Sequence, residues 1–135
     1  MDPEIWGPHG WYFLHSITLA YPDNPTEDDK IYHKNFFESL KYILPCEKCR
    51  NHYTQNLNIY PIENHLDNKL SLFKWLVDVH NKVNINNGKP EYSYDEVTKL
   101  YENMYSKKEN TYFISNTMLL VIFIILVSFI IYKFK

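Results

Sequence analysis

The stretch that decides the fold is NKLSLFKWLVDVHNKVNINNGKP, residues 68–90. Its apolar residues recur at spacings of three and four, the period of one face of an α-helix. They are Leu72, Leu76, Val79 and Val83. Gly88 and Pro90 follow, and these residue types typically end a helix. We therefore predict a helix from about residue 68 to residue 86.

The same helical period recurs on both sides of this stretch and outscores strand-like alternation. Further helices are predicted over residues 8–20, 26–44 and 45–56, and from residue 93 onward. The expected apolar stripes are Tyr32, Phe36, Leu40 and Ile43, and then Val97, Leu100, Tyr101, Met104 and Tyr105. Thr26 and Asp29 resemble a capping box, as do Ser93 and Glu96. The sequence therefore predicts an all-α fold, a compact antiparallel bundle plus one extra helix.

Charge and length limit the possible functions. The 135 residues are enough for one ordinary domain with a modest core. Residues 1–110 carry 12 basic and 16 acidic side chains, and no predicted helix has a stripe of lysine and arginine. Because nucleic-acid binding requires a basic surface, we expect no nucleic-acid partner.

The C-terminal segment differs from the rest of the chain. Residues 112–132 contain no charged side chain, and as a helix they would span about 31 Å, which matches the hydrocarbon core of a bilayer. We predict a folded domain over residues 1–108 and a single-pass transmembrane helix over residues 112–132. The N-terminus lacks the apolar run of a signal peptide. The expected topology is therefore a C-terminal anchor with the domain on the cytosolic face.

The chain has two cysteines, Cys46 and Cys49. A zinc site could draw on them and on His52, His65 and His80, but the second close ligand pair of such sites is missing. A structural disulfide is a second possibility, although closing so short a loop removes little chain entropy. A redox-active pair is the third, because a helix N-terminus stabilises a thiolate.

A second group of polar residues lies on the helix predicted over residues 68–86. His80 and Asn84 are four residues apart and share a helix face, and Asn81 adjoins them. Hydrogen-bonding side chains beside Val77 and Val83 suit a planar heteroaromatic ligand with polar edges. The predicted dithiol and this ligand site would complement each other as electron donor and acceptor.

Three segments resemble the Erv/ALR family of FAD-linked sulfhydryl oxidases. They are WGPHGWYFLHSITLAYP (6–22), LPCEKC (44–49) and WLVDVHNKVNINNGKPEYSYDEV (75–97). The chain is similar to the small membrane-anchored versions found in large DNA viruses, which would place it in a host intracellular or virion membrane. The resemblance implies a four-helix bundle plus a short fifth helix that cradles FAD and pairs as a homodimer.

The resemblance also assigns cofactor-binding residues. They are Gly7, Trp11, His15, Val77, His80, Asn81, Val83, Asn84, Lys89 and Tyr101. Lys89 would contact phosphate, and Tyr101 stands where the family usually has a tryptophan. Leu44 stands where an aromatic residue often precedes the Pro-Cys pair.

The activity implied by the resemblance is thiol oxidation. A substrate dithiol would attack Cys46, Cys49 would pass two electrons to the flavin, and oxygen would accept them as hydrogen peroxide. Because the chain has no further cysteine, its partner would be a protein dithiol substrate or a separate thioredoxin-like shuttle. Two alternatives are a membrane-anchored helical binding or scaffold protein without flavin, and a zinc-binding module.

Overall fold

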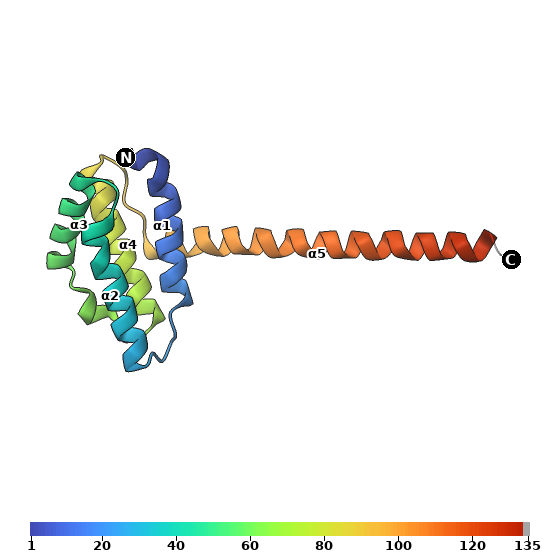
Figure 1. Ribbon diagram of the computed structural model, residues 1–135, viewed down its shortest axis with the longest axis horizontal. Coiled ribbons are helices and arrows are strands. Elements are labelled where there is room, and N and C mark those ends of the chain that lie inside the picture. Colours follow the sequence, from blue (N-terminus) through green and yellow to red (C-terminus); the bar gives the residue numbers. More distant parts are fainter. Residues whose placement is uncertain (134–135) are drawn as a thin grey trace. The chain divides into compact units, whose positions relative to one another are not determined.

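The computed structural model describes residues 1–133, apart from the side chains of residues 107–116. The chain divides into two compact units, residues 1–94 and the residues from 95 onward. The helices of the first unit are α1 (Pro3–Ala20), α2 (Glu27–Ile43), α3 (Glu47–Ile59), the short 3-10 helix η1 (Ile62–His65) and α4 (Lys69–Asn86) (Figure 1). The last helix, α5 (Tyr94–Lys133), forms the second unit apart from its first residue. The described residues form helices and connecting turns, so the predicted all-α class is confirmed.

Side chains set the helix starts. The Thr26 hydroxyl oxygen accepts from the Asp29 backbone N–H, and the Asp29 carboxylate accepts from the Thr26 N–H, so the predicted capping box is confirmed. Asp2 and Asn68 accept backbone N–H bonds in the same way at the starts of α1 and α4. These bonds satisfy N–H groups that have no partner within the helix. Gly88, at a φ of 68°, follows the end of α4, in a conformation that favours glycine.

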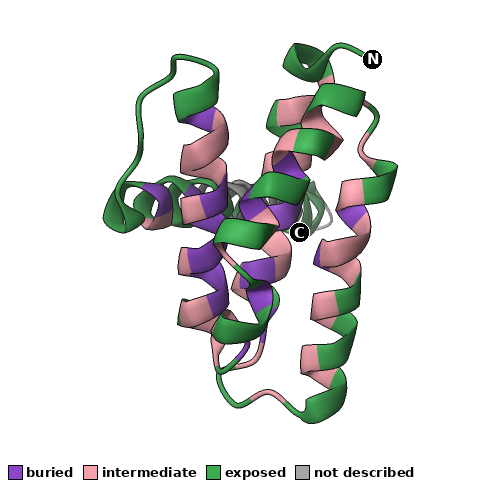
Figure 2. Ribbon diagram, turned by 90° about the vertical axis from the view of Figure 1, so that its left-hand side faces the viewer, coloured by how far each residue is buried: buried purple, intermediate pink, exposed green. Residues whose placement is uncertain are grey.

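The core of the first unit lies where α1 packs on α4, and where α3 packs on α2 and α4. Buried positions lie along the inward sides of these helices (Figure 2). The large aromatic side chains are buried with their polar atoms bonded to backbone carbonyls. Trp75 Nε1 donates to Tyr60 O at 2.8 Å, and the Tyr53 hydroxyl donates to Phe37 O at 3.0 Å. Such bonds remove the cost of burying an indole N–H or a phenol.

Three helix boundaries differ from the prediction. α1 begins at Pro3 rather than near residue 8, because Asp2 caps it and Pro8 is accommodated inside the helix. α3 runs on to Ile59 rather than ending near residue 56, and η1, which was not predicted, follows it. Cys46 is the residue that caps α3 and not part of its first turn.

The predicted apolar stripe of α2 is wrong at both ends. Tyr32 and Ile43 are each 66 % exposed, whereas Phe37, which the stripe omitted, is fully buried. Phe36 and Phe37 are adjacent, so either could have started a stripe of the right period, and packing against Trp75 selects Phe37. In α5, Val97 and Tyr101 are buried, but Leu100, Met104 and Tyr105 are exposed.

The fifth helix is not short. α5 continues as one helix of 40 residues through the segment predicted as a separate transmembrane helix. Within the part of the chain that the structure describes, no helix has both the length and the apolar character needed to cross a membrane. The side chains of residues 112–116, which belong to the predicted span, lie outside that part.

Candidate active site

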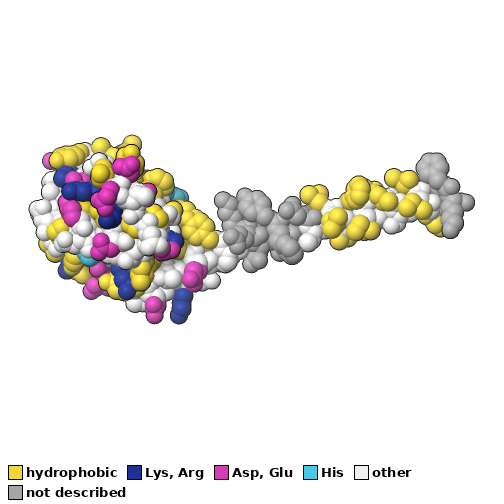
Figure 3. Space-filling view, turned by 90° about the horizontal axis from the view of Figure 1, so that it is seen from below, with side chains coloured by type: hydrophobic (Ala, Val, Ile, Leu, Met, Phe, Trp, Pro, Cys, Tyr) yellow, Lys and Arg dark blue, Asp and Glu magenta, His cyan; other side chains and the backbone are white. Residues whose placement is uncertain are grey.

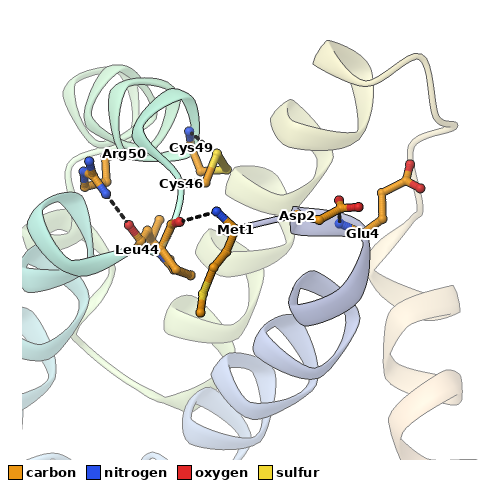
Figure 4. The surroundings of a disulfide bond; sticks show 8 residues. Met1, Asp2, Glu4, Leu44, Cys46, Cys49 and Arg50 are labelled. Carbon is orange, nitrogen blue, oxygen red and sulfur yellow. Dashed lines mark hydrogen bonds between the residues drawn. A yellow bond between two sulfur atoms is a disulfide. The ribbon is translucent and has the colours of Figure 1, made fainter.

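The cysteine pair forms a disulfide at the start of α3. Cys46 and Cys49 are bonded to each other (Figure 4). The Cys49 backbone N–H donates to Cys46 Sγ at 3.2 Å, and the first N–H groups of α3 favour negative charge at this position. Both residues are half-buried. Their exposure therefore does not separate the roles of substrate-facing and flavin-facing sulfur, and that assignment stays a prediction.

Two hydrogen bonds hold the turn before the disulfide. Arg50 Nη1 donates to Leu44 O at 2.6 Å, and the Met1 ammonium donates to Pro45 O at 3.3 Å (Figure 4). Leu44 itself is half-buried against the core. The arginine bond joins the first turns of α3 to the C-terminus of α2, where a cation is favourable. The turn that presents Cys46 is thus fixed at both carbonyls that precede it.

A ring cluster lies where α1 meets α4. The rings of Trp11 and His80 are stacked, with centroids 3.8 Å apart and planes 8° apart. His15 Nε2 and His80 Nδ1 are 3.2 Å apart, so one ring nitrogen donates and the other accepts. Residues separated by 65 positions in the sequence therefore form one site.

Burial keeps both histidines neutral. It lowers the pKa of His15 from 6.5 to about 3, with a smaller contribution from His80. It also lowers the pKa of His80 to about 4, and the positive charge of Lys89 adds to this shift. At pH 7 each ring therefore offers one donor and one acceptor and carries no charge.

The other predicted cofactor residues are placed as follows. Val77 and Asn84 are buried on α4, while Val83 and Asn81 are half-buried and Lys89 is exposed. Gly7 is half-buried, and a Cβ atom on it would meet no heavy atom within 4 Å. Tyr101 is buried and belongs to the second unit, so its part in the site stays a prediction.

Two features of this region were not predicted from the sequence. Within the described residues, the buried Nε1 of Trp6 has no hydrogen-bond partner. The Asn81 side chain bonds to the backbone of Tyr92. Trp6 is the first residue of the family-like segment that begins WGPHGW, so its presence there could have marked it as a site residue. Among the described side chains, no group of three or more histidine, cysteine or acidic residues could hold a metal ion.

Comparison with known proteins identifies the family. Residues 8–104 match the Erv1 / Alr family. A protein of Acanthamoeba polyphaga mimivirus named as a probable FAD-linked sulfhydryl oxidase is 44 % identical over 114 residues, which cover 83 % of this chain and 80 % of that protein. The match includes both the cysteine pair and the ring cluster, and this chain belongs to the Erv1 / Alr family.

Yeast relatives agree with the viral one. The mitochondrial FAD-linked sulfhydryl oxidase ERV1 of Saccharomyces cerevisiae is 32 % identical over 93 residues, which cover 67 % of this chain and 47 % of that protein. The crystal structure of the FAD binding domain of Erv1 from Saccharomyces cerevisiae has a TM-score of 0.65 at 30 % identity and covers 69 % of this chain and 87 % of that one. The predicted resemblance is therefore confirmed.

The neutral histidines predict a dependence of stability on pH. Because the folded-state pKa values lie below 6.5, the unfolded chain binds more protons between pH 6.5 and about 4. The free energy of unfolding should therefore fall as the pH falls, with a limiting slope of about 1.4 kcal/mol per pH unit for each histidine. Denaturant titrations at pH 6.5 and 4.5 should show a smaller loss for His80→Gln. The control His9→Gln removes an exposed histidine of α1 and should retain the full loss. Equal losses in the wild type and His80→Gln would contradict this account.

Proposed function

We propose that this protein is a FAD-dependent thiol oxidase that forms disulfide bonds in protein dithiol substrates. The observation that carries the proposal is the disulfide at the start of α3 in a chain of the Erv1 / Alr family. The viral and yeast relatives are named as FAD-linked sulfhydryl oxidases. An enzyme of this kind needs a reducible disulfide and a site for an electron acceptor.

The residues of the ring cluster fit a flavin cofactor. A planar heteroaromatic ring with polar edges needs flat apolar surface and neutral hydrogen-bonding groups. Trp11 and Val77 supply apolar surface, while His15, His80 and Asn84 supply polar groups. The buried Trp6 Nε1 donor, which has no partner among the described residues, and the open space beside Gly7 agree with a ligand at this end of α1. These residues, with Val83 and Lys89, are the proposed cofactor site.

The cysteine pair carries out thiol–disulfide exchange. A substrate thiolate attacks Cys46 Sγ, the bond between Cys46 and Cys49 breaks, and its electron pair leaves on Cys49 as a thiolate. The second substrate thiolate then attacks the substrate sulfur of this mixed disulfide. Oxidised substrate departs, and Cys46 is released as a thiolate that accepts a bond from the Cys49 N–H. The substrate has lost two electrons, and the cysteine pair has gained them.

FAD bound at this site would supply a two-electron acceptor for the reduced cysteine pair, with oxygen as the final acceptor and hydrogen peroxide as the product. The chain itself has no second cysteine pair to act as a shuttle. Substrates therefore reach Cys46 directly or through a separate thioredoxin-like protein.

A membrane anchor and a homodimer are further parts of the proposal. The uncharged sequence of residues 112–132 and the exposed apolar side chains from Met118 to Tyr132 support a C-terminal membrane anchor with the oxidase domain on the cytosolic side. Figure 3 contrasts the mixed charges over the first unit with the apolar side chains along the described end of α5.

Exposed Phe13, Ile31 and Tyr32 on α1 and α2 support pairing of two copies.

The activity is tested with the purified full chain. It should carry the visible absorbance of an oxidised flavin and consume oxygen when dithiothreitol is added. Cys46→Ser and Cys49→Ser should each reduce oxygen uptake to the level without enzyme while keeping the flavin spectrum, because they remove the disulfide and leave the ring cluster intact. Gln55→Ala, exposed on α3, is the control that retains uptake. A chain without flavin would favour the scaffold alternative, and stoichiometric zinc would favour the metal alternative.

The anchor is tested by extraction of membranes with alkaline carbonate. The full chain should stay in the membrane pellet, whereas Ile124→Arg combined with Ile125→Arg should be released. Each arginine costs about 2.5 to 3.5 kcal/mol at the centre of a membrane helix. Ile59→Arg, which alters an exposed residue of α3, should stay in the pellet. Release of the unaltered chain would contradict the anchor.

The homodimer is tested by sedimentation of the full chain in detergent. The measured protein mass should be twice that of one chain. Tyr32→Glu should shift the distribution toward one copy, because it places a charge in the proposed apolar contact. Leu70→Glu, at an exposed residue of α4, should not. A single copy at all concentrations of the unaltered chain would rule out the dimer.

A further inference from the structure

Asn81 uses its side-chain amide to hold backbone rather than leaving it open to a ligand. Its Nδ2 donates to Tyr92 O at 2.8 Å, and its Oδ1 accepts from the Tyr92 N–H at 3.0 Å. Both polar atoms of one side chain thus bond to both backbone groups of one residue. Such a paired contact fixes orientation as well as distance.

The segment that follows α4, residues 87–94, is held at other points too. At its start, the Lys89 N–H donates to Asn84 O, in the last turn of α4, at 2.8 Å. Gly88 supplies the left-handed backbone conformation of this turn, with a φ of 68°. Beyond Tyr92, the Tyr94 hydroxyl donates to Asp78 Oδ1 at 2.8 Å. Residues 87–94 therefore fold back along the second half of α4.

The consequence of this path concerns Lys89. The backbone N–H of Lys89 is bonded to Asn84 O, and Asn84 lies one helical turn beyond His80 on the same side of α4. The chain therefore places Lys89 near the ring cluster, and its positive charge also contributes to the lowered pKa of His80. Among the described residues, His15 of α1 also faces His80. With the backbone of Lys89 fixed at Asn84 and the segment closed at Asn81, this cation has a restricted range of positions although its side chain is exposed.

We propose that Asn81 is a positioning residue, a latch whose bonds to Tyr92 hold residues 87–93 against α4 and so keep Lys89 beside His80. This changes the role that the family resemblance assigned to Asn81, from cofactor contact to holder of a cation. A cation held beside neutral rings suits a ligand that joins a flat heterocycle to phosphate. That last step rests on the proposed function, whereas the latch does not.

The test measures the pKa of His80 by NMR in the flavin-free full chain at low salt. Lys89→Gln should raise this pKa by about 0.5 or more, because it removes a nearby positive charge. Asn81→Ala should also raise it, and the double variant should raise it no further than Lys89→Gln does. Lys82→Gln removes a charge from α4 that is not held by the latch, and it should leave the pKa unchanged.

The double variant separates the latch from simple loosening of the fold. If Asn81→Ala acted by exposing His80 to water, it would raise the pKa further in the Lys89→Gln background, and the proposal would fail. It would also fail if Asn81→Ala left the pKa unchanged while Lys89→Gln raised it, or if neither changed it.

A second variant covers the case in which Asn81→Ala does not fold, as judged by circular dichroism. Tyr92→Pro removes the N–H that Asn81 Oδ1 accepts and leaves Asn81 in place. It should raise the pKa of His80 as Asn81→Ala would. An unchanged pKa in Tyr92→Pro would overturn the latch.

FAD titration is the final readout, in which Asn81→Ala should weaken binding in the wild-type background but not in the Lys89→Gln background. Failure to bind FAD at all would refute the proposed function and leave the pKa result intact.

Discussion

The contact between His15 and His80 joins α1 to α4, and the packing of the first unit and its candidate site both depend on it. His15 Nε2 and His80 Nδ1 are 3.2 Å apart, and the Trp11 ring is stacked on the His80 ring. Two imidazoles at this distance in a buried place cannot both be protonated without strong repulsion and loss of hydration. The helices therefore pack with neutral rings, and neutral rings are the chemical groups that recognise the edges of a heterocycle. One constraint thus serves stability and, in the proposed function, ligand recognition.

The disulfide depends on a different and more local kind of structure. Pro45 lies between the end of α2 and the start of α3, and Cys46 caps α3 with its own sulfur. Residues within seven positions of one another, from Leu44 to Arg50, make the contacts that shape this turn. Because both cysteines are used here, no other disulfide supports the bundle. Buried aromatic residues such as Trp75, Phe37 and Tyr53 provide the support instead. The Trp75 indole and the Tyr53 hydroxyl donate to backbone carbonyls.

The helical period of the sequence predicted the four α-helices of the first unit and the buried stripe of α4, which includes Leu72, Leu76 and Val79, but neither η1 nor the inward face of α2. The α2 stripe drawn through Tyr32 and Ile43 has the correct period, yet these residues are exposed and Phe37 is buried. A rotation of about 100° separates neighbouring residues of a helix, so a small error of phase moves a whole stripe. The phase is set by the partner surface, here the Trp75 ring, which lies on a distant part of the chain.

The sequence by itself determined the local features: the capping box at Thr26, the end of α4 at Gly88, the cysteines at a helix start and the family motifs. These depend on residues that are close neighbours along the chain, whose backbone preferences act before any folding partner is present. The tertiary structure alone decided that His15 meets His80 and that Asn81 holds the backbone of Tyr92. Such contacts depend on how the helices pack and on the path of the loop after α4. The local sequence permits several such arrangements, and the burial of the whole apolar core selects one of them.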